Sequence, residues 1–259
     1  MSDHASRFGG IARLFGAEKL ERLRRAHVCV VGLGGVGSWA VEALARSAVG
    51  TLTLIDLDDV CVSNVNRQLH ALDGAIGRPK VEVMAERARA INPDCTTCPV
   101  AEFFSEANAD QMLATPFDFV IDAIDGPSNK ALLIAKCRER GLRIVASGGA
   151  AGRRDPTAIR VADLAFSSHD RLLSQVRRVL RRFRGFPRGE QPFGVDCVFS
   201  AEPPLFPQQD GSVCGTRDPE APVQIDCEHG LGTATFVTGA FGFAAASVAV
   251  RGIVEATRS

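Results

Sequence analysis

The residues that bear most directly on chemistry follow the apolar segment 51–56. Asp56 ends this segment, and a carboxylate at the end of a buried strand can hold the hydroxyls of a ribose; Asp58 is a second candidate by its spacing. Two cations come later, and such cations neutralise phosphate charge and stabilise the charge that develops when a phosphate bond breaks. These cations are Arg67 and Lys80, and the amides of Asn64 and Gln68 accompany them. The alternative is that both cations form ordinary ion pairs at the surface.

A glycine-rich turn precedes this group, between a strand pattern and a helix pattern in residues 27–47. Backbone N–H groups of such a turn, together with the N-terminus of the following helix, bind phosphate anions. The glycines are Gly32, Gly34, Gly35 and Gly37. These glycines are compatible with a site for a dinucleotide that takes part in hydride transfer, and equally with a site for ATP that is cleaved between its phosphates. A close-packed turn that binds no ligand would also need small residues.

Two further carboxylates lie at the end of the apolar segment 118–123 and just beyond it, and they separate the two chemistries. Asp122 and Asp125 would lie at the same sheet edge as Asp56, where Mg²⁺ with bound phosphates would sit. An oxidoreductase that uses a nicotinamide cofactor has no need of such a carboxylate together with the two cations. The set therefore favours ATP cleavage.

The elements that must position these residues alternate along the first part of the chain. Near-continuous apolar segments predict strands buried on both faces, with helices between them. The strands are expected at 27–32, 51–56, 118–123 and 142–147, and the helices at 79–91 and 129–140. This order predicts an α/β fold with a doubly wound, mostly parallel, Rossmann-like sheet that binds ligands at the carboxyl ends of its strands.

Beyond Gly152 the alternation weakens. The expected elements are a strand at 158–162, a basic helix at 170–184, a strand at 194–200 and an apolar C-terminal helix. No linker is long enough to divide the chain, so we expect one nucleotide-binding domain over residues 1–259. Its parts are an N-terminal helical arm at 1–26, an ATP-binding core at 27–150 and a C-terminal α/β extension at 151–259 that faces the substrate.

The composition is that of a soluble globular protein, with 46% apolar and 23% charged residues. Thirty basic and thirty acidic side chains cancel, so any attraction for nucleic acid must be local. Eight cysteines, and a start without the apolar region of a secretory leader, predict a reducing, cytoplasmic location. The uncharged residues 230–250 are long enough to span a membrane, but their Gly, Ala and Thr content favours a helix buried against the sheet.

The motifs and their order resemble those of the ubiquitin-activating-like adenylyltransferases, a family that includes enzymes of molybdopterin and thiamine synthesis. The motifs are G-x-G-G-x-G, D-x-D followed by N-x-x-R-Q, G-x-P-K and D-x-x-D. Within that family the sequence is most similar to the enzymes that dehydrate threonylcarbamoyladenosine in tRNA. The stretches concerned are LIDLDDVCVSNVNRQLHAL, VEVMAERARAINP, GVDCVFSAE and FGFAAAS, and the resemblance extends over nearly the whole chain.

The resemblance implies ATP and Mg²⁺ as cofactors. It implies that the four glycines form the nucleotide loop, that Asp56 binds the ribose and that Asp125 binds Mg²⁺. It implies that Arg67 and Lys80 bind the phosphates and that the amides of Asn64 and Gln68 support this phosphate site. Relatives that activate carrier proteins often have two C-x-x-C pairs, and this chain has one, at 95–98. A structural zinc needs four ligands, so none is expected.

The implied reaction joins AMP to the threonyl carboxylate of a modified adenosine beside the tRNA anticodon, with release of pyrophosphate. The carbamoyl group of the same substrate then closes on the activated carbon and expels AMP, so the net change is the loss of water. Two alternatives stay open. One is an adenylyltransferase that activates a ubiquitin-like sulfur carrier, against which the missing zinc pairs argue; the other is a nucleotide-binding scaffold for sulfur-transfer proteins.

The resemblance also implies a homodimer. In the family an arginine of the N-terminal helix enters the partner's site within an R-F/Y-x-R pattern, whereas this chain reads Arg7-Phe8-Gly9-Gly10. The second arginine is absent, and Arg7 or Arg13 is the candidate to substitute for it. The family is associated with a cysteine desulfurase system, so Cys227 is a candidate sulfur acceptor. We expect no catalytic role for Cys227, because ring closure needs no external nucleophile.

One local concentration of charge occurs in this otherwise neutral chain. Residues 171–188 contain seven arginines and no acidic residue, and their apolar residues form one helical face. Arg177, Arg178, Arg181 and Arg182 lie largely off that face and are candidates for contacts with tRNA phosphates. A solvated amphipathic helix, a helix at a membrane surface or one that binds an acidic protein would show the same pattern.

Overall fold

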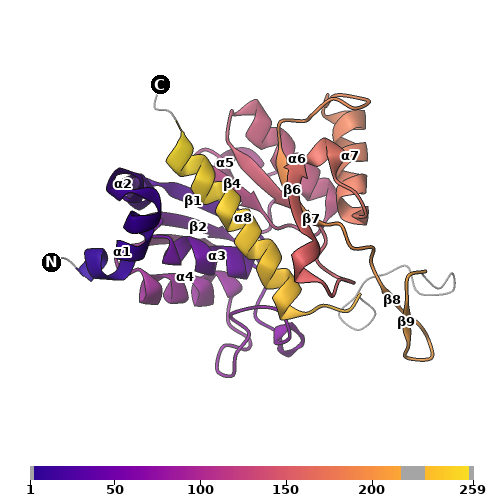
Figure 1. The fold of residues 1–259 in the computed structure, drawn as a ribbon, viewed down its shortest axis with the longest axis horizontal. Helices are drawn as coiled ribbons and strands as arrows, with labels where there is room; N and C mark the ends of the chain where they lie inside the picture. The colour runs from indigo at the N-terminus through magenta and orange to yellow at the C-terminus, as the bar shows by residue number, and fades with distance from the viewer. Residues whose placement is uncertain (1–2, 217–230, 257–259) are drawn as a thin grey trace.

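The computed structural model describes residues 3–216 and 231–256 (Figure 1). Within these ranges seven strands form one sheet in the order β3-β2-β1-β4-β5-β7-β6, parallel throughout except that β6 is antiparallel to β7. The strands are β1 His27–Val31, β2 Thr51–Ile55, β3 Thr96–Val100, β4 Phe119–Asp122, β5 Ile144–Ser147, β6 Ile159–Asp163 and β7 Asp196–Ser200. A separate hairpin pairs β8 Phe206–Pro207 with β9 Val213–Cys214.

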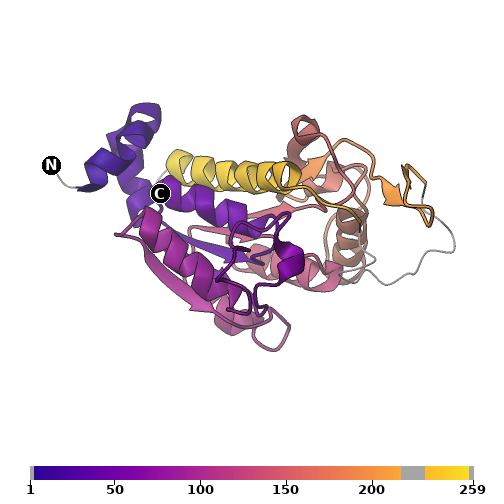
Figure 2. The same ribbon diagram turned by 90° about the horizontal axis from the view of Figure 1, so that it is seen from below.

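Helices cover both faces of this sheet (Figure 1, Figure 2). Successive residues of a strand point to opposite faces, so Val28 and Val30 of β1 join one apolar core, while Cys29 and Val31 join the other. The first core contains α3 Gly37–Arg46, α4 Lys80–Ile91 and α8 Thr235–Glu255; the second contains α5 Ala109–Met112, α6 Pro127–Glu139 and α7 Arg171–Phe183. The N-terminal helices are α1 Asp3–Phe15 and α2 Ala17–Arg25, and short 3₁₀ turns are η1 Val62–Asn64, η2 Pro156–Ala158 and η3 Leu164–Phe166.

The last helix, α8, corresponds to the uncharged C-terminal segment. By length and composition alone it could cross a membrane, but 67% of its most apolar window is buried within this fold. It lies along α3, as Figure 2 shows. Gly242 makes this approach possible, because a Cβ there would lie 2.7 Å from the Cβ of Trp39 and 2.9 Å from the backbone nitrogen of Ala40. The helix is therefore part of the core, as its small residues indicate.

The α/β fold and the mostly parallel, doubly wound sheet predicted from the sequence are confirmed. One strand of the seven-stranded sheet was not predicted: β3 forms an edge of the sheet and consists of two threonines, Cys98, Pro99 and Val100. The short strands β8 and β9 of the separate hairpin were not predicted either. In β3 the alternation of apolar and polar residues is weak, and its proline is of the kind that edge strands tolerate. An edge strand buries less surface, so its sequence carries less of the apolar signal that reveals the central strands.

Candidate nucleotide-binding site

The carboxyl ends of β1 and β4 lie side by side in the middle of the sheet. From β1 the chain passes through α3 to β2 on one side, whereas from β4 it passes through α6 to β5 on the other. In open α/β sheets ligands bind in the crevice at such a point of divergence. The loops that follow β1, β2 and β4 therefore form the candidate site.

The loop after β1 requires glycine at two positions for backbone reasons. Gly32 has a φ of 90°, and a Cβ there would lie 2.7 Å from the carbonyl oxygen of Ala123, just after β4. A Cβ on Gly37 would overlap the carbonyl oxygen of Gly32. Gly34 faces more open space, with the side-chain nitrogen of Gln68 at 3.9 Å from its would-be Cβ. No side chain caps the first turn of α3. The backbone N–H of Ser38 donates to the carbonyl oxygen of Gly34 at 3.2 Å, and the N–H groups of this turn that have no such backbone partner are available to an anion.

Asp56 connects this glycine loop to the loop after β2. One carboxylate oxygen accepts the backbone N–H of Leu33 at 2.6 Å, and the other accepts the backbone N–H of Asp58 at 2.9 Å. Burial raises the pKa of Asp56, while the Leu33 N–H and the charge of Lys80 act in the opposite direction. The carboxylate is held beside the glycine loop and keeps further lone pairs for the hydroxyls of a ribose.

Lys80 begins α4, and its ammonium lies 2.7 Å from a carboxylate oxygen of Asp58. Two buried amides lie in the turn before it. Asn64 ends η1 and accepts the backbone N–H of Cys61 at 3.1 Å. The side-chain oxygen of Gln68 has no hydrogen-bond partner within the described part of the chain. Asn64 thus fixes the turn that carries Arg67, and Gln68 retains a free acceptor next to the glycine loop.

Arg67 lies between η1 and α4, among turns. Its guanidinium donates to the carbonyl oxygen of Ser63 at 2.7 Å and to the side-chain oxygen of Asn66 at 3.0 Å. Its own carbonyl oxygen accepts hydrogen bonds from Trp39 Nε1 at 3.0 Å and from Thr238 Oγ1 at 3.3 Å. Sequence reasoning missed Trp39 and Thr238, because no motif spacing connects them with the arginine. The one available signal was that Trp39 is the only tryptophan and stands beside the glycine loop.

The two carboxylates at the carboxyl end of β4, Asp122 within the strand and Asp125 after it, have different surroundings. Asp122 is fully buried, and its carboxylate lies 2.9 Å from the ammonium of the equally buried Lys130. Burial raises the pKa of Asp122, and the charge of Lys130 opposes this. Asp125 is exposed at the carboxyl edge of the sheet. The expectation that both carboxylates face Mg²⁺ therefore does not fit Asp122, which Lys130 already neutralises, and Asp125 is the carboxylate available to a ligand.

Nearly the whole chain matches a known family: the ThiF family model covers residues 9–257. The chain belongs to the ThiF family. This confirms the resemblance to the ubiquitin-activating-like adenylyltransferases that the motifs indicated.

Two relatives that match this ThiF family member over most of its length share one name. The chain is 49% identical to the tRNA threonylcarbamoyladenosine dehydratase of Escherichia coli strain K12 over 95% of this chain and 92% of that protein. It is 48% identical to the protein of the same name from Haemophilus influenzae over 95% of this chain and 93% of the relative. It also matches a structure of the Escherichia coli tRNA N6-threonylcarbamoyladenosine dehydratase in complex with ATP, with a TM-score of 0.87, 45% identity and coverage of 97% and 96% of the two chains.

The arginine-rich segment of this ThiF family member forms α7 on the second face of the sheet. A cavity of about 420 Å³ is lined by Ser174, Arg177, Arg178, Arg181, Arg182 and Arg188. The four predicted arginines fall into two pairs. Arg178 and Arg182 are exposed, whereas Arg177 donates to the hydroxyl of Ser167 and Arg181 to two carbonyl oxygens of the loop after α7.

The two candidate arginines of the N-terminal arm lie away from the glycine loop. Arg7 and Arg13 belong to α1; Arg7 donates to the carbonyl oxygen of Ile91 at 3.4 Å, and Arg13 is exposed. Within residues 3–216 and 231–256 no group of three His, Cys, Asp or Glu side chains could hold a metal ion. Cys227 lies outside the described residues, so its role as a sulfur acceptor stays a prediction.

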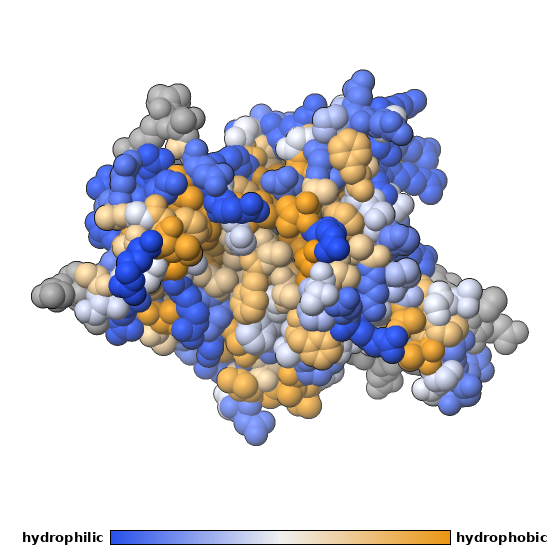
Figure 3. All heavy atoms as spheres, in the orientation of Figure 1, coloured by the Kyte–Doolittle hydropathy of each residue, from blue (hydrophilic) through white to orange (hydrophobic). Residues whose placement is uncertain are grey.

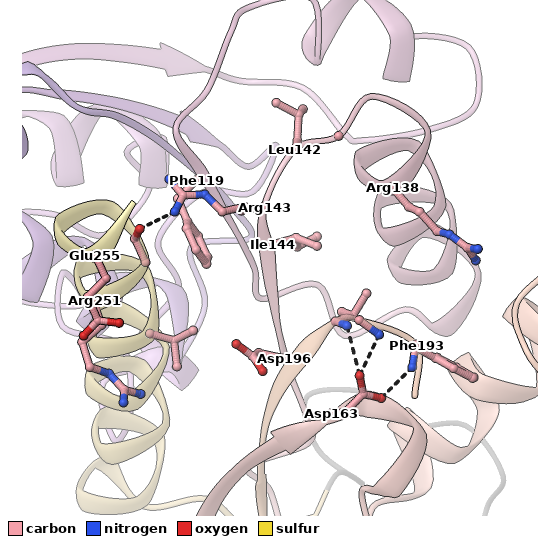
Figure 4. A pocket seen from close by; sticks show the side chains of 15 residues that line it. Phe119, Arg138, Leu142, Arg143, Ile144, Asp163, Phe193, Asp196, Arg251 and Glu255 are labelled. Atoms are coloured by element: carbon pink, nitrogen blue, oxygen red, sulfur yellow. Dashed lines mark hydrogen bonds between the residues drawn. The ribbon is translucent and has the colours of Figure 1, made fainter. Parts of the chain in front are cut away.

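A larger cavity, of about 610 Å³, opens at the opposite edge of the sheet (Figure 4). Its walls include Ile144 at the start of β5, Asp196 at the start of β7 and the last turns of α8. Asp163 also lines it, and accepts the backbone N–H of Phe193 at 2.9 Å. None of the predicted site residues lines this cavity, so it is separate from the candidate nucleotide site.

Proposed function

We propose that this chain is an ATP-dependent dehydratase of threonylcarbamoyladenosine in tRNA. Two relatives at 48–49% identity, matched over 92–93% of their own length, carry that name. The observation that carries the proposal is that Asp56 and Arg67 lie against the glycine loop where the connections of the sheet diverge. Lys80 lies beside them, paired with Asp58, whose backbone N–H binds the carboxylate of Asp56. A would-be Cβ of Gly35 lies 3.3 Å from Arg67 Cγ, which brings the arginine directly against that loop.

The reaction has two steps. An oxygen of the threonyl carboxylate attacks the α-phosphorus of ATP. The bond between this phosphorus and the oxygen that bridges to the β-phosphate breaks, and pyrophosphate leaves with that oxygen. The carbamoyl group of the substrate then attacks the acyl carbon and loses a proton as AMP leaves. The modified adenosine loses one water, and ATP becomes AMP and pyrophosphate. Because the attacking group belongs to the substrate, no thiol of the protein is needed.

The residues of the site divide this work. Arg67 and Lys80 would stabilise the negative charge that accumulates on the phosphates, and Asp56 would hold the ribose. The exposed carboxylate of Asp125 fits Mg²⁺, a hard cation that prefers carboxylate and phosphate oxygens and supplies further charge neutralisation when bound. The supporting positions are Gly32, Gly34, Gly35 and Gly37 of the loop, the ion-pair partner Asp58, and the amides of Asn64 and Gln68.

We propose that α7 contacts the tRNA backbone. The helix begins at the carboxyl edge of the sheet, because Asp170 caps its first turn and also accepts the backbone N–H of Gly149, just after β5, at 2.9 Å. At 1.5 Å per residue, Arg178 and Arg182 lie about 10–17 Å along the helix from that edge. Their exposed guanidinium groups are available for phosphates of a nucleic acid whose modified base lies at the nucleotide site.

We propose a homodimer formed through one apolar face. Figure 3 shows apolar side chains gathered over α8 and over the loops near its N-terminal end. The large exposed apolar side chains of these two regions are Leu57, Val62, Val65, Leu72, Ile76, Phe236 and Phe243. Contiguous apolar patches of this kind mark interaction sites, and the family resemblance makes a second copy the expected occupant. In that dimer Arg7 or Arg13 of one protomer would act in the site of the other.

Two further expectations become proposals on the same basis, and a third stays a prediction. We treat the chain as one domain, since β6 and β7 of the extension complete the sheet of the core. We assign it to the cytoplasm, where its tRNA substrate is found. A sulfur-relay partner that includes a cysteine desulfurase stays a prediction.

The decisive experiment incubates the protein with ATP, Mg²⁺ and tRNA that carries threonylcarbamoyladenosine, followed by mass spectrometry of the nucleosides. We expect loss of one water from the modified adenosine, with AMP and pyrophosphate formed in equal amounts. Asp125→Asn, which keeps the size of an exposed side chain, should abolish most of the product without unfolding the protein. AMP formation without any change in the nucleoside would contradict the proposal.

A further inference from the structure

The backbone of Arg67 is held by two helices that are distant from it in sequence. The segment between η1 and α4 consists of turns and bends, so no helix or strand fixes its position. The carbonyl oxygen of Arg67 accepts Trp39 Nε1 from α3 at 3.0 Å and Thr238 Oγ1 from α8 at 3.3 Å. Thr238 shares its hydroxyl with the carbonyl oxygen of Thr235, also at 3.3 Å, so the indole N–H is the better donor.

The side chain of Arg67 is connected to the same region. Its guanidinium donates to the side-chain oxygen of Asn66 at 3.0 Å. The side-chain nitrogen of Asn66 donates in turn to the carbonyl and hydroxyl oxygens of Thr233, at 3.0 and 3.1 Å. Thr233 lies two residues before the first residue of α8, so the start of this helix and the residues before it support both the backbone and the guanidinium of the arginine.

The packing explains why a tryptophan and a threonine occupy these places. The indole ring lies against Gly239, whose would-be Cβ is 3.6 Å from it, and meets the ring of Phe243 edge-on with centroids 5.8 Å apart. Thr238 is 3% exposed, and its methyl group lies 3.2 Å from the would-be Cβ of Gly35 in the nucleotide loop. Trp39 of α3 therefore packs against α8, and Thr238 of α8 packs against the nucleotide loop. Both residues also bind the carbonyl oxygen of Arg67, so this close packing leaves the arginine backbone little freedom of movement.

We propose that Trp39 and Thr238 are positioning residues for the adenylation step, which hold the backbone of Arg67 so that its guanidinium meets the phosphates of ATP. The inference rests on the proposed phosphate-binding role of Arg67. A charge stabiliser works best when its place is fixed before the reaction, and small displacements of such groups lower the rate. The two donors perform this fixation without touching the substrate.

The test is a set of double-mutant cycles measured as turnover of the modified tRNA. Trp39→Phe keeps an aromatic ring on Gly239 and removes the N–H, and Thr238→Val keeps the shape and removes the hydroxyl. Each change should lower kcat by about three- to tenfold, the effect of one hydrogen bond. In an Arg67→Ala background the same changes should have almost no further effect, because the group they position is gone.

Two measurements keep the outcomes distinct. Thr53→Val removes a buried hydroxyl that pairs with His27 instead, at 2.8 Å, and should leave kcat unchanged. If Trp39→Phe and Thr238→Val lower kcat equally with and without Arg67, they act through general stability and the inference is wrong. If Arg67→Ala has no effect, the proposed role of Arg67 fails instead. If the turnover of Arg67→Ala is too slow to measure, the same double-mutant cycle is measured as ATP affinity by titration calorimetry. We again expect Trp39→Phe and Thr238→Val to weaken binding only when Arg67 is present.

Discussion

The ammonium of Lys80 lies 2.7 Å from a carboxylate oxygen of Asp58, and the two partners differ sharply in exposure. The side chain of Lys80 is 6% exposed, whereas that of Asp58 is 71% exposed. The pair joins the end of β2 to the start of α4, but Asp58 can exchange the lysine for water at little cost. Lys80 has no such alternative, since its ammonium is enclosed. A phosphate group arriving at the site would therefore displace Asp58 and not Lys80.

This asymmetry predicts unequal effects of two substitutions. Lys80→Met, which keeps the length of an unbranched side chain, should lower ATP-dependent turnover by about a hundredfold or more, because a charge stabiliser is removed. Asp58→Asn keeps the shape and should cost about tenfold at most, since the exposed carboxylate only orients the lysine. Steady-state kinetics with saturating tRNA tests both. Equal losses in the two variants would show that Asp58 itself contacts the reacting groups.

The sequence predicted the parts of the site that follow directly from strand ends. Gly32 and Asp56 each come immediately after a near-continuous apolar run, and parallel strands bring their carboxyl ends to one edge. The hydrogen bonds of Trp39 and Thr238 to Arg67 could not be predicted in this way. They bridge residues 28 and 171 positions apart through the packing of α3 on α8, and such side-chain contacts leave no periodic trace in the sequence.

The two carboxylates at the carboxyl end of β4 show the same limit in a different way. The sequence pattern does not distinguish Asp122 from Asp125, because both lie at the end of an apolar segment. The difference arises from Lys130, which lies eight residues beyond Asp122 in α6 and whose ammonium is buried against it. Lysine is seldom fully buried, so an exposed position is the default expectation from sequence. Only the packed structure reveals that Lys130 neutralises one carboxylate and leaves the other to a ligand.

The arginines of α7 differ in exposure and in their hydrogen bonds, and this difference predicts two different effects. Arg178→Gln with Arg182→Gln should weaken tRNA binding and reduce the slope of log affinity against log salt by about 0.7–0.9 for each phosphate that the variant no longer neutralises. Arg177→Gln with Arg181→Gln removes internal hydrogen bonds and should mainly lower the melting temperature. Filter binding across a salt series, combined with thermal unfolding, tests both pairs.

A matched control for the arginine pairs is available on α2. Arg24 and Arg25 are exposed on that helix and pair with Glu21, so replacing both by glutamine should change neither the slope nor the affinity for tRNA. An unchanged slope in the Arg178 and Arg182 variant would make α7 an ordinary solvated helix.

The apolar face on α8 predicts a change of oligomeric state. Phe243, which is 48% exposed, lies within that face, and Phe243→Glu should convert a dimer to a monomer at micromolar concentration because an unpaired charge would be buried in the interface. Phe103 is 59% exposed but follows the edge strand β3, so Phe103→Glu is the control and should leave the mass unchanged. Light scattering coupled to size exclusion measures both. A monomeric parent protein would contradict the proposed dimer.

An arginine that acts across the dimer predicts complementation. Arg13→Ala should lower turnover if Arg13 enters the partner's site, and Asp125→Asn should do the same within its own site. Mixing the two variants and allowing protomers to exchange should restore part of the activity, since one site of each hybrid dimer has both residues intact. The same mixture made with Arg7→Ala shows which arginine acts. No recovery with either arginine variant would exclude action in trans.

His70 predicts a specific dependence of stability on pH. The side chain is 1% exposed, and neither ring nitrogen has a hydrogen-bond partner among the described residues. Burial, with a smaller contribution from the charge of Lys80, lowers the pKa of His70 from 6.5 to about 4. In the unfolded chain the imidazole takes up its proton near its ordinary pKa, whereas in the folded protein it stays neutral until the pH approaches 4. Between these pH values the unfolded state binds more protons than the folded state, so the free energy of unfolding falls as the pH falls. The total loss is roughly 3 kcal/mol, at about 1.4 kcal/mol per pH unit.

His70→Leu should remove this contribution. Urea unfolding should therefore show a flatter decline of stability in the variant than in the parent over that pH window. Equal declines in parent and variant would mean that His70 has the same pKa in the folded and unfolded protein. The loss of stability in acid would then not arise from the burial of His70.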